Sequence, residues 1–83
     1  MPQKLDENQQ VILQRLAERV KSIRISKGWT LEEAGNGGGK DRQSVHRLET
    51  GKYNPSIVYL IELCRGFEID ISELLKGIDN EPL

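Results

Sequence analysis

Three features of this sequence have residue types that could support chemistry: His46, Cys64 and the glycine-rich segment from Gly35 to Lys40. His46 has no acid or nucleophile in step with it, which argues against a catalytic or metal-binding role. Cys64 lies on an apolar helical stripe, which is typical of a small buried residue. The glycine-rich segment lacks the spacing of a phosphate-binding loop and has Asp41 where that loop needs serine or threonine. We therefore expect no enzyme activity, no cofactor and no metal.

Charge is spread unequally along the chain, although the formal net charge is only −1. Residues 1–53 contain ten lysines and arginines and seven acids, whereas residues 54–83 contain two basic and six acidic residues. The first part therefore carries +3 and the second −4. An anionic partner would be met by the first two thirds of the chain. Ordinary charge scatter on a solvated surface is the alternative explanation.

Length and composition fit one small domain. Eighty-three residues, 36% hydrophobic and 30% charged, allow a single core. A core of this size usually contributes only about 3–5 kcal/mol, and the single cysteine cannot form an internal disulfide, so we expect a homodimer. No segment approaches the roughly 20 apolar residues of a membrane helix, and the N-terminus has no signal-peptide pattern. Both observations favour a cytoplasmic protein without membrane contact.

The elements that position these residues are predicted to be helical. Apolar residues recur at steps of three and four from Val11 to Lys27, and Gly28 suits the left-handed residue that follows a helix. Thr30 and Glu33 form a capping-box pattern that starts a second helix. The glycines at 35 and 37–39 would each cost about 0.5–1 kcal/mol inside a helix. We expect the second helix to be short or frayed.

Three further helices are predicted from their caps. Asp41 can cap a helix over residues 42–50, Ser56 can cap one over 57–67, and a capping box at Asp70 and Glu73 opens a short fifth helix. The expected buried stripe of the fourth helix is Ile57, Leu60, Ile61, Leu63, Cys64 and Phe67. No alternating strand pattern is present. The sequence therefore predicts an all-α domain of five short helices at residues 11–78, with an extension at 1–10 and a tail at 79–83.

From Leu16 to about Lys76 the sequence resembles the helix-turn-helix family of the phage Cro and repressor proteins, also called XRE-like. The order and spacing of five stretches carry the resemblance: LAERVKSIR at 16–24, KGWTLEE at 27–33, SVHRLETGK at 44–52, NPS at 54–56 and ISELL at 71–75. It implies a lambda-repressor-like domain whose first motif helix runs from Thr30 to about Asn36. The helix from Arg42 to Thr50 would then be the recognition helix in the major groove of DNA.

The resemblance also implies roles for individual side chains. Base contacts are assigned to Arg42, Gln43, Ser44 and His46; arginine suits guanine and glutamine suits adenine, each at about 1–3 kcal/mol of discrimination. Phosphate contacts are assigned to Thr30, Lys40, Arg47, Lys52, Tyr53 and Asn54. Arg24 and Glu49 match a partly buried ion pair that joins the first helix to the third. Without the resemblance, Arg42 and Gln43 would be read as plain surface residues.

Four positions depart from the family pattern. Leu31 stands where the family usually has a phosphate-binding glutamine, and Glu68 stands where glycine often ends the fourth helix. Gly35 and Gly38 replace residues of the core, so we expect them to add nothing to it. The first motif helix is therefore predicted to be held loosely until DNA or a partner arrives.

The sequence predicts a sequence-specific DNA-binding regulator of transcription, with repression as the leading hypothesis, that reads a palindromic site as a symmetric homodimer. The fourth and fifth helices and the tail are the expected dimer contact. Ile25, Val58 and Tyr59 are apolar where related chains tend to be polar, which fits either an interface or scattered surface residues. A phage-type repressor, a restriction–modification controller and a toxin-binding antitoxin stay open, so double-stranded DNA and a toxin are the candidate partners. The contrasting hypothesis is a protein-interaction adaptor built on a degraded helix-turn-helix.

Overall fold

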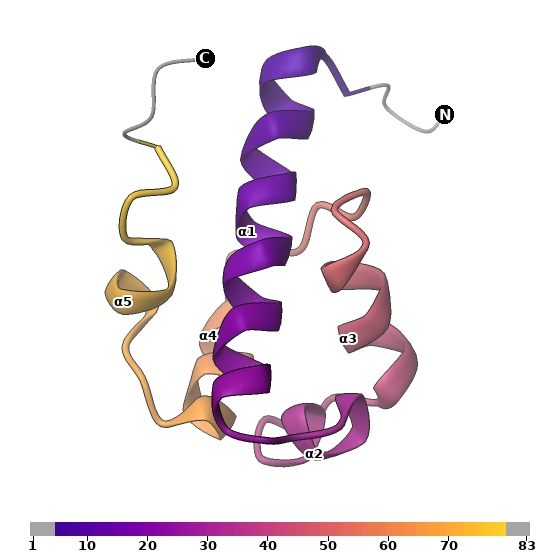
Figure 1. Cartoon of the computed structure of the whole chain (residues 1–83), viewed down its shortest axis with the longest axis vertical. Helices are drawn as coiled ribbons and strands as arrows, with labels where there is room; N and C mark the ends of the chain where they lie inside the picture. The colour runs from indigo at the N-terminus through magenta and orange to yellow at the C-terminus, as the bar shows by residue number, and fades with distance from the viewer. Residues whose placement is uncertain (1–4, 80–83) are drawn as a thin grey trace.

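Five α-helices account for the regular structure of residues 5–79, the part of the chain that the computed structural model describes. They are α1 (Glu7–Ser26), α2 (Leu31–Asn36), α3 (Arg42–Glu49), α4 (Ile57–Phe67) and α5 (Ile71–Leu75). Figure 1 shows the long α1 in the middle, with α3 on one side and α5 on the other. The predicted all-α fold of five short helices is confirmed. The predicted tail lies, except for Asp79, outside the described residues.

The first helix begins earlier than the sequence predicts. The Asp6 carboxylate accepts a hydrogen bond from the Gln9 backbone N–H at 2.8 Å, and the Gln9 side chain accepts one from the Asp6 backbone N–H at 3.0 Å. This capping box starts α1 at Glu7, so the predicted start at Val11 is wrong. Residues 7–10, predicted as part of an extension, form the first turn of α1.

Capping side chains also start the next two helices, at the predicted positions. The Thr30 hydroxyl accepts from the Glu33 backbone N–H at 3.1 Å, and the Glu33 carboxylate accepts from the Thr30 backbone N–H at 2.8 Å. The Asp41 carboxylate accepts from the Ser44 backbone N–H at 2.8 Å, which starts α3 at Arg42. These bonds satisfy amides that have no partner within the helix.

The last two helices differ in how their ends are fixed. The Ser56 hydroxyl accepts from the Tyr59 backbone N–H at 3.0 Å and starts α4 as predicted. Glu68 ends α4 in the left-handed conformation with a φ of 61°. Asp70 makes no capping hydrogen bond through its side chain, so the predicted capping box at α5 is wrong, although that helix does begin at Ile71.

The core lies where α1, α3, α4 and α5 meet. Its most completely buried large side chains are Val20, Val45, Leu48, Leu63, Phe67 and Leu74. Two members of the predicted stripe of α4 are not buried: Ile57 is 55% exposed and Ile61 is 36% exposed. On α1, Ile12 is likewise exposed, while its neighbour Leu13 is buried. The outer face of α4 is therefore more apolar than a purely solvated helix requires.

The glycines of the α2–α3 turn lie against the backbone of α4 and of the turn itself. A Cβ added at Gly37 would lie 2.7 Å from the Gly66 Cα, and one added at Gly38 would overlap the Glu62 carbonyl group. A Cβ added at the buried Gly35 would overlap the Lys40 carbonyl group. Gly35 and Gly38 contribute no side chain to the core, but they have a packing role: the missing Cβ at Gly35 lets the turn close at Lys40, and the missing Cβ at Gly38 lets the turn approach α4. The second helix is short, as predicted, but capped and packed against α3 and α4.

Groups with potential reactivity are few in the described part of the chain. Cys64 is buried, and burial raises the pKa of its thiol. Among residues 5–79 no three His, Cys, Asp or Glu side chains gather in a way that could hold a metal ion. Over the same range no helix is long and apolar enough to span a bilayer.

Candidate nucleic-acid interface

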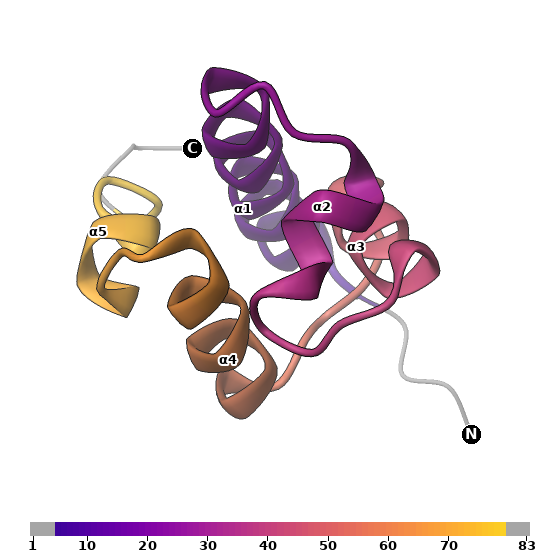
Figure 2. The same ribbon diagram turned by 90° about the horizontal axis from the view of Figure 1, so that it is seen from below.

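Helices α2 and α3 form a compact pair joined by a tight turn. Figure 2 shows the two helices together on the side of the molecule opposite α5. The turn closes through hydrogen bonds from the backbone N–H groups of Gly38 and Lys40 to the Gly35 carbonyl, at 3.1 and 2.8 Å. Gly39 adopts the left-handed conformation with a φ of 71°. The glycine-rich segment is therefore a turn that sets the direction of α3.

The leading end of α3 projects away from the core. Val45 and Leu48 are completely or almost completely buried, which fixes the rotation of the helix about its axis. Arg42, Gln43 and His46 are exposed on the opposite side. An arginine and a glutamine on a free helix end are able to donate to or accept from the edges of base pairs.

Ser44 is placed differently from its neighbours on α3. It is only partly exposed, and its hydroxyl donates to the Asp41 carbonyl at 3.0 Å and lies 2.9 Å from the Tyr59 hydroxyl on α4. The Asp41 carboxylate has a pKa below its ordinary value, chiefly because it accepts a hydrogen bond from the Ser44 backbone N–H. Ser44 thus joins the cap of α3 to α4.

Lys40, at the end of the turn, is also engaged within the protein. Its ammonium group forms an ion pair with the Glu62 carboxylate at 2.6 Å and lies 4.7 Å from the centre of the Tyr59 ring. The hydrogen bond and the charge of Lys40 lower the pKa of Glu62. Its side chain is 17% exposed. The position assigned to a phosphate contact therefore links the turn to α4.

Two tyrosines support α3 from the α4 side. The rings of Tyr53 and Tyr59 meet edge to face with their centres 6.4 Å apart. The Arg47 guanidinium lies 5.6 Å from the centre of the Tyr53 ring. Arg47 is exposed, so its charge remains available to an anion next to α3.

Arg24 and Glu49 join α1 to the far end of α3. The Arg24 guanidinium donates to both Glu49 carboxylate oxygens at 2.8 and 3.0 Å and to the Trp29 carbonyl at 2.9 Å. The two side chains are 15% and 7% exposed, and the hydrogen bond to Glu49 raises the pKa of Arg24. The ion pair that the resemblance implied is present and ties three segments together.

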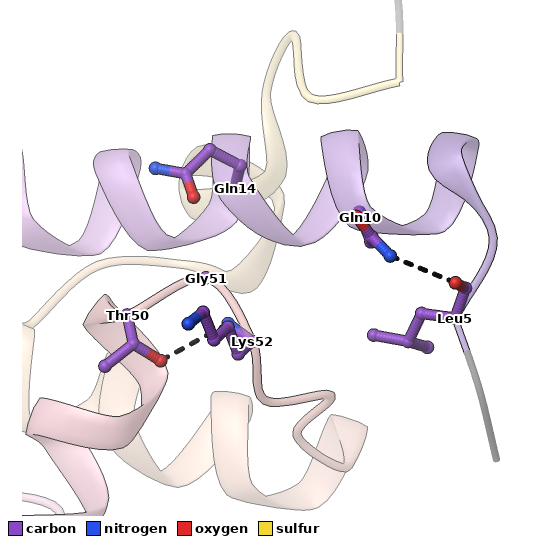
Figure 3. Close-up of a pocket in the computed structure, with 6 residues that line it drawn as sticks. All are labelled: Leu5, Gln10, Gln14, Thr50, Gly51 and Lys52. Carbon is purple, nitrogen blue, oxygen red and sulfur yellow. Dashed lines mark hydrogen bonds between the residues drawn. The ribbon is translucent and has the colours of Figure 1, made fainter.

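A cleft of mixed polar and apolar lining lies beside the turn that follows α3 (Figure 3). It has a volume of about 440 Å³ and is lined by Leu5, Gln10, Gln14, Thr50, Gly51 and Lys52. Gly51 has a φ of 79°, and a Cβ there would overlap the Gln14 side chain, so α1 and this turn approach closely. Lys52, which lines the cleft, and Asn54 are exposed, and Thr30 is exposed at the start of α2. These positions offer polar donors at the start of α2 and in the segment after α3.

The helix-turn-helix geometry agrees with comparisons to known proteins. A model of the family described as helix-turn-helix matches residues 20–74, which include all of α2 and α3. The chain belongs to the XRE-like helix-turn-helix family. It is therefore a DNA-binding transcriptional regulator of that family.

Similar proteins support the assignment. An uncharacterized HTH-type transcriptional regulator from Archaeoglobus fulgidus is 35% identical over 63 residues, which cover 76% of this chain and 90% of the relative. The uncharacterized HTH-type transcriptional regulator YgzD from Bacillus subtilis is 29% identical over 59 residues, which cover 71% of this chain and 89% of the relative. The solved structure of the restriction-modification controller protein C.AhdI from Aeromonas hydrophila matches with a TM-score of 0.71 and 31% identity. The match covers 75% of this chain and 94% of C.AhdI. The structure of the hypothetical transcription factor NHTF from Neisseria matches with a TM-score of 0.72 and 25% identity. The match covers 90% of this chain and 85% of NHTF.

Within this helix-turn-helix domain, sequence reasoning missed Tyr59 and Glu62. Tyr59 was predicted only to be an apolar position of an interface or of a scattered surface, and Glu62 was counted only among the acids of residues 54–83. Their partners Ser44 and Lys40 lie 15 and 22 residues away in the sequence. The only local signal was the unusual aromatic residue at 59, because contacts between separate helices leave no fixed spacing in a sequence.

Proposed function

We propose that the protein regulates transcription by sequence-specific binding to operator DNA, with Arg42, Gln43 and His46 of α3 contacting bases. The observation that supports this proposal is the exposed leading end of α3, which no other described part of the chain covers. Phosphate contacts are proposed for Thr30 before α2, Arg47 on α3, and Lys52, Tyr53 and Asn54 in the segment after α3; such contacts hold the helix in register without reading sequence. Binding at a promoter would exclude polymerase, so repression is the proposed outcome.

The proposed binding unit is a homodimer on a palindromic site. Ile57, Val58 and Ile61 form an exposed apolar strip on α4, and Val58 is 60% exposed. Burying such a strip against a second copy would add the stability that a small core lacks. Sedimentation of Val58→Asp should show a lighter species than the wild type. Ile25→Asp, at a residue 57% exposed on α1, is the matched control and should leave the mass unchanged.

Selection from random duplexes tests the base contacts directly. The wild type should enrich a palindrome, and Arg42→Ala and Gln43→Ala should each relax the preference at different base pairs. Arg65→Ala removes an exposed arginine from α4 and should enrich the same sequence as the wild type. Absence of any enriched sequence at low salt would refute the proposal.

Salt dependence separates phosphate contacts from base contacts. Lys52→Ala should lower the affinity for all duplexes by a similar factor and reduce the slope of log affinity against log salt by about 1. Lys76→Ala, which replaces an exposed lysine after α5, is the control and should keep the slope.

A protein-interaction adaptor would have no duplex affinity to lose. The argument for an adaptor rested on a poorly formed second helix and on Leu31; of these, the first does not hold, because α2 is capped and packed.

A restriction–modification controller is the regulator role with an observation in its favour. The solved controller C.AhdI shares 31% identity and a TM-score of 0.71 with this chain. Mapping the selected operator on the genome tests this role: a site beside endonuclease and methyltransferase genes supports it. A site beside a toxin gene would instead support an antitoxin.

A further inference from the structure

The first turn of α3 and the turn that precedes α3 are each tied to α4. The Ser44 hydroxyl lies 2.9 Å from the Tyr59 hydroxyl, and the Lys40 ammonium lies 2.6 Å from the Glu62 carboxylate. Tyr59 and Glu62 are three residues apart on α4 and so lie on one face of that helix. The two ties are placed on either side of Arg42 and Gln43.

Either oxygen of this pair could donate by its chemistry, but the Ser44 hydroxyl donates its single proton to the Asp41 carbonyl, which leaves the Tyr59 hydroxyl as the donor to Ser44. Tyr59 is partly buried, and burial raises the pKa of its hydroxyl, so the proton stays in place across the physiological range. The ring is held as well, by the Lys40 ammonium at 4.7 Å and by the Tyr53 ring at 6.4 Å. Tyr59 is therefore a fixed donor to the first turn of α3.

Bidentate contacts with bases depend strongly on placement. A contacting side chain must be held within about 0.5 Å and 10–20° of its productive geometry, which its supporting residues provide. Arg42 and Gln43 are exposed on the first turn of an eight-residue helix, so their placement depends on how that turn is held. The contacts of Lys40 with Glu62 and of Ser44 with Tyr59 hold this turn against α4.

We infer that Tyr59 is a positioning residue for base recognition, which acts through Ser44 to fix the angle at which Arg42 and Gln43 enter the groove. This inference rests on the proposed base contacts of those two residues. It assigns Ser44 an indirect part in sequence discrimination, in place of a direct contact with a base.

Tyr59→Phe tests the inference because it removes only the donor and keeps the ring. The measured quantity is the ratio of affinities for the enriched duplex and for a duplex changed at the base pair that Gln43→Ala relaxes. This ratio does not depend on the fraction of folded protein, so a modest loss of stability does not affect it. We expect Tyr59→Phe to lower the ratio about threefold to tenfold, the factor typical of one hydrogen bond.

Arg65→Ala is the matched control on α4, since it removes an exposed side chain of the same helix while the bond between Tyr59 and Ser44 stays. It should keep the wild-type ratio. Ser44→Ala should lower the ratio by the same factor as Tyr59→Phe, and the double variant should be no worse than either single one. A wild-type ratio in Tyr59→Phe would overturn the inference, and so would multiplying effects of the two substitutions. If Gln43→Ala relaxes no base pair, the proposed function itself fails.

Discussion

Replacing Gly66 with alanine tests how closely α4 must approach the turn before α3. Gly66 lies inside α4, where helix propensity alone favours alanine over glycine by about 0.5–1 kcal/mol. The structure predicts the opposite sign. An added Cβ would lie 2.7 Å from the Gly38 nitrogen and 2.9 Å from the Gly37 carbonyl carbon, whereas ordinary contact begins at 3.4 Å. The helix and the turn would have to separate by about 0.7 Å.

The size of the effect follows from two opposing contributions. Forcing extra volume into a packed contact typically costs 1–3 kcal/mol, and the neighbours here are backbone atoms that cannot rotate away. Subtracting the gain in propensity leaves a net loss of about 1–2 kcal/mol. For a domain of this size that corresponds to a fall in melting temperature of roughly 5–15 °C.

Urea unfolding followed by Trp29 fluorescence measures the loss. Trp29 is the single tryptophan, and its ring lies 6.0 Å from that of the buried Phe67. Glu68→Gly is the matched control two residues away, because Glu68 holds a left-handed φ of 61° that glycine adopts freely. It should raise the free energy of unfolding by about 0.5–1 kcal/mol. A Gly66→Ala protein as stable as the wild type, or more stable, would refute the close-packing argument.

Three further predictions concern single side chains. Glu49→Gln should lower the free energy of unfolding by about 2–3 kcal/mol, since the Arg24 guanidinium loses charged hydrogen bonds at a mostly buried site; urea unfolding measures it. Folding lowers the pKa of the Asp41 carboxylate below its ordinary value of 3.8. The charged carboxylate therefore stabilises the fold fully at a pH above 3.8, and this stabilisation is lost as the pH falls through the lower pKa of the folded state. The wild type should therefore melt higher than Asp41→Asn at neutral pH, with a gap that closes in acid; a constant gap contradicts this. The buried Cys64 thiol, whose pKa is raised, should react with a thiol reagent only as fast as the protein opens.

Helix starts were predictable because the signals are local. Thr30 with Glu33, Asp41 and Ser56 each sit at most three residues from the amides that they bind, so sequence spacing is enough. The same reasoning could have found the start of α1, because Asp6 and Gln9 have the required spacing. It failed at α5, where the pattern is present and the Asp70 side chain makes no capping bond.

The candidate site was predictable in outline for a related reason. Burial of Val45 and Leu48 sets which side of α3 faces outward, and helical periodicity gives that from the sequence. The partners of Ser44 and Lys40 could not be predicted in this way, since α4 meets α3 only in the folded chain. The same holds for the glycines, whose low helix propensity suggested fraying, whereas their lack of a side chain is what close packing requires.

Helix α4 faces two ways, and this links dimer formation to operator reading. Its inner side, which here means the side toward the α2–α3 turn, binds Ser44 of α3 through Tyr59 and Lys40 of that turn through Glu62, and its outer side carries the exposed strip that includes Val58. If two copies pack through that strip, each α3 is fixed to the dimer contact through a single rigid element. The distance between the two α3 helices would then be set by α4, as binding to half-sites about one helical turn apart requires. A substitution on the inner side of α4 should therefore change base discrimination without changing the half-site spacing, whereas a substitution on the outer side should weaken both half-sites together.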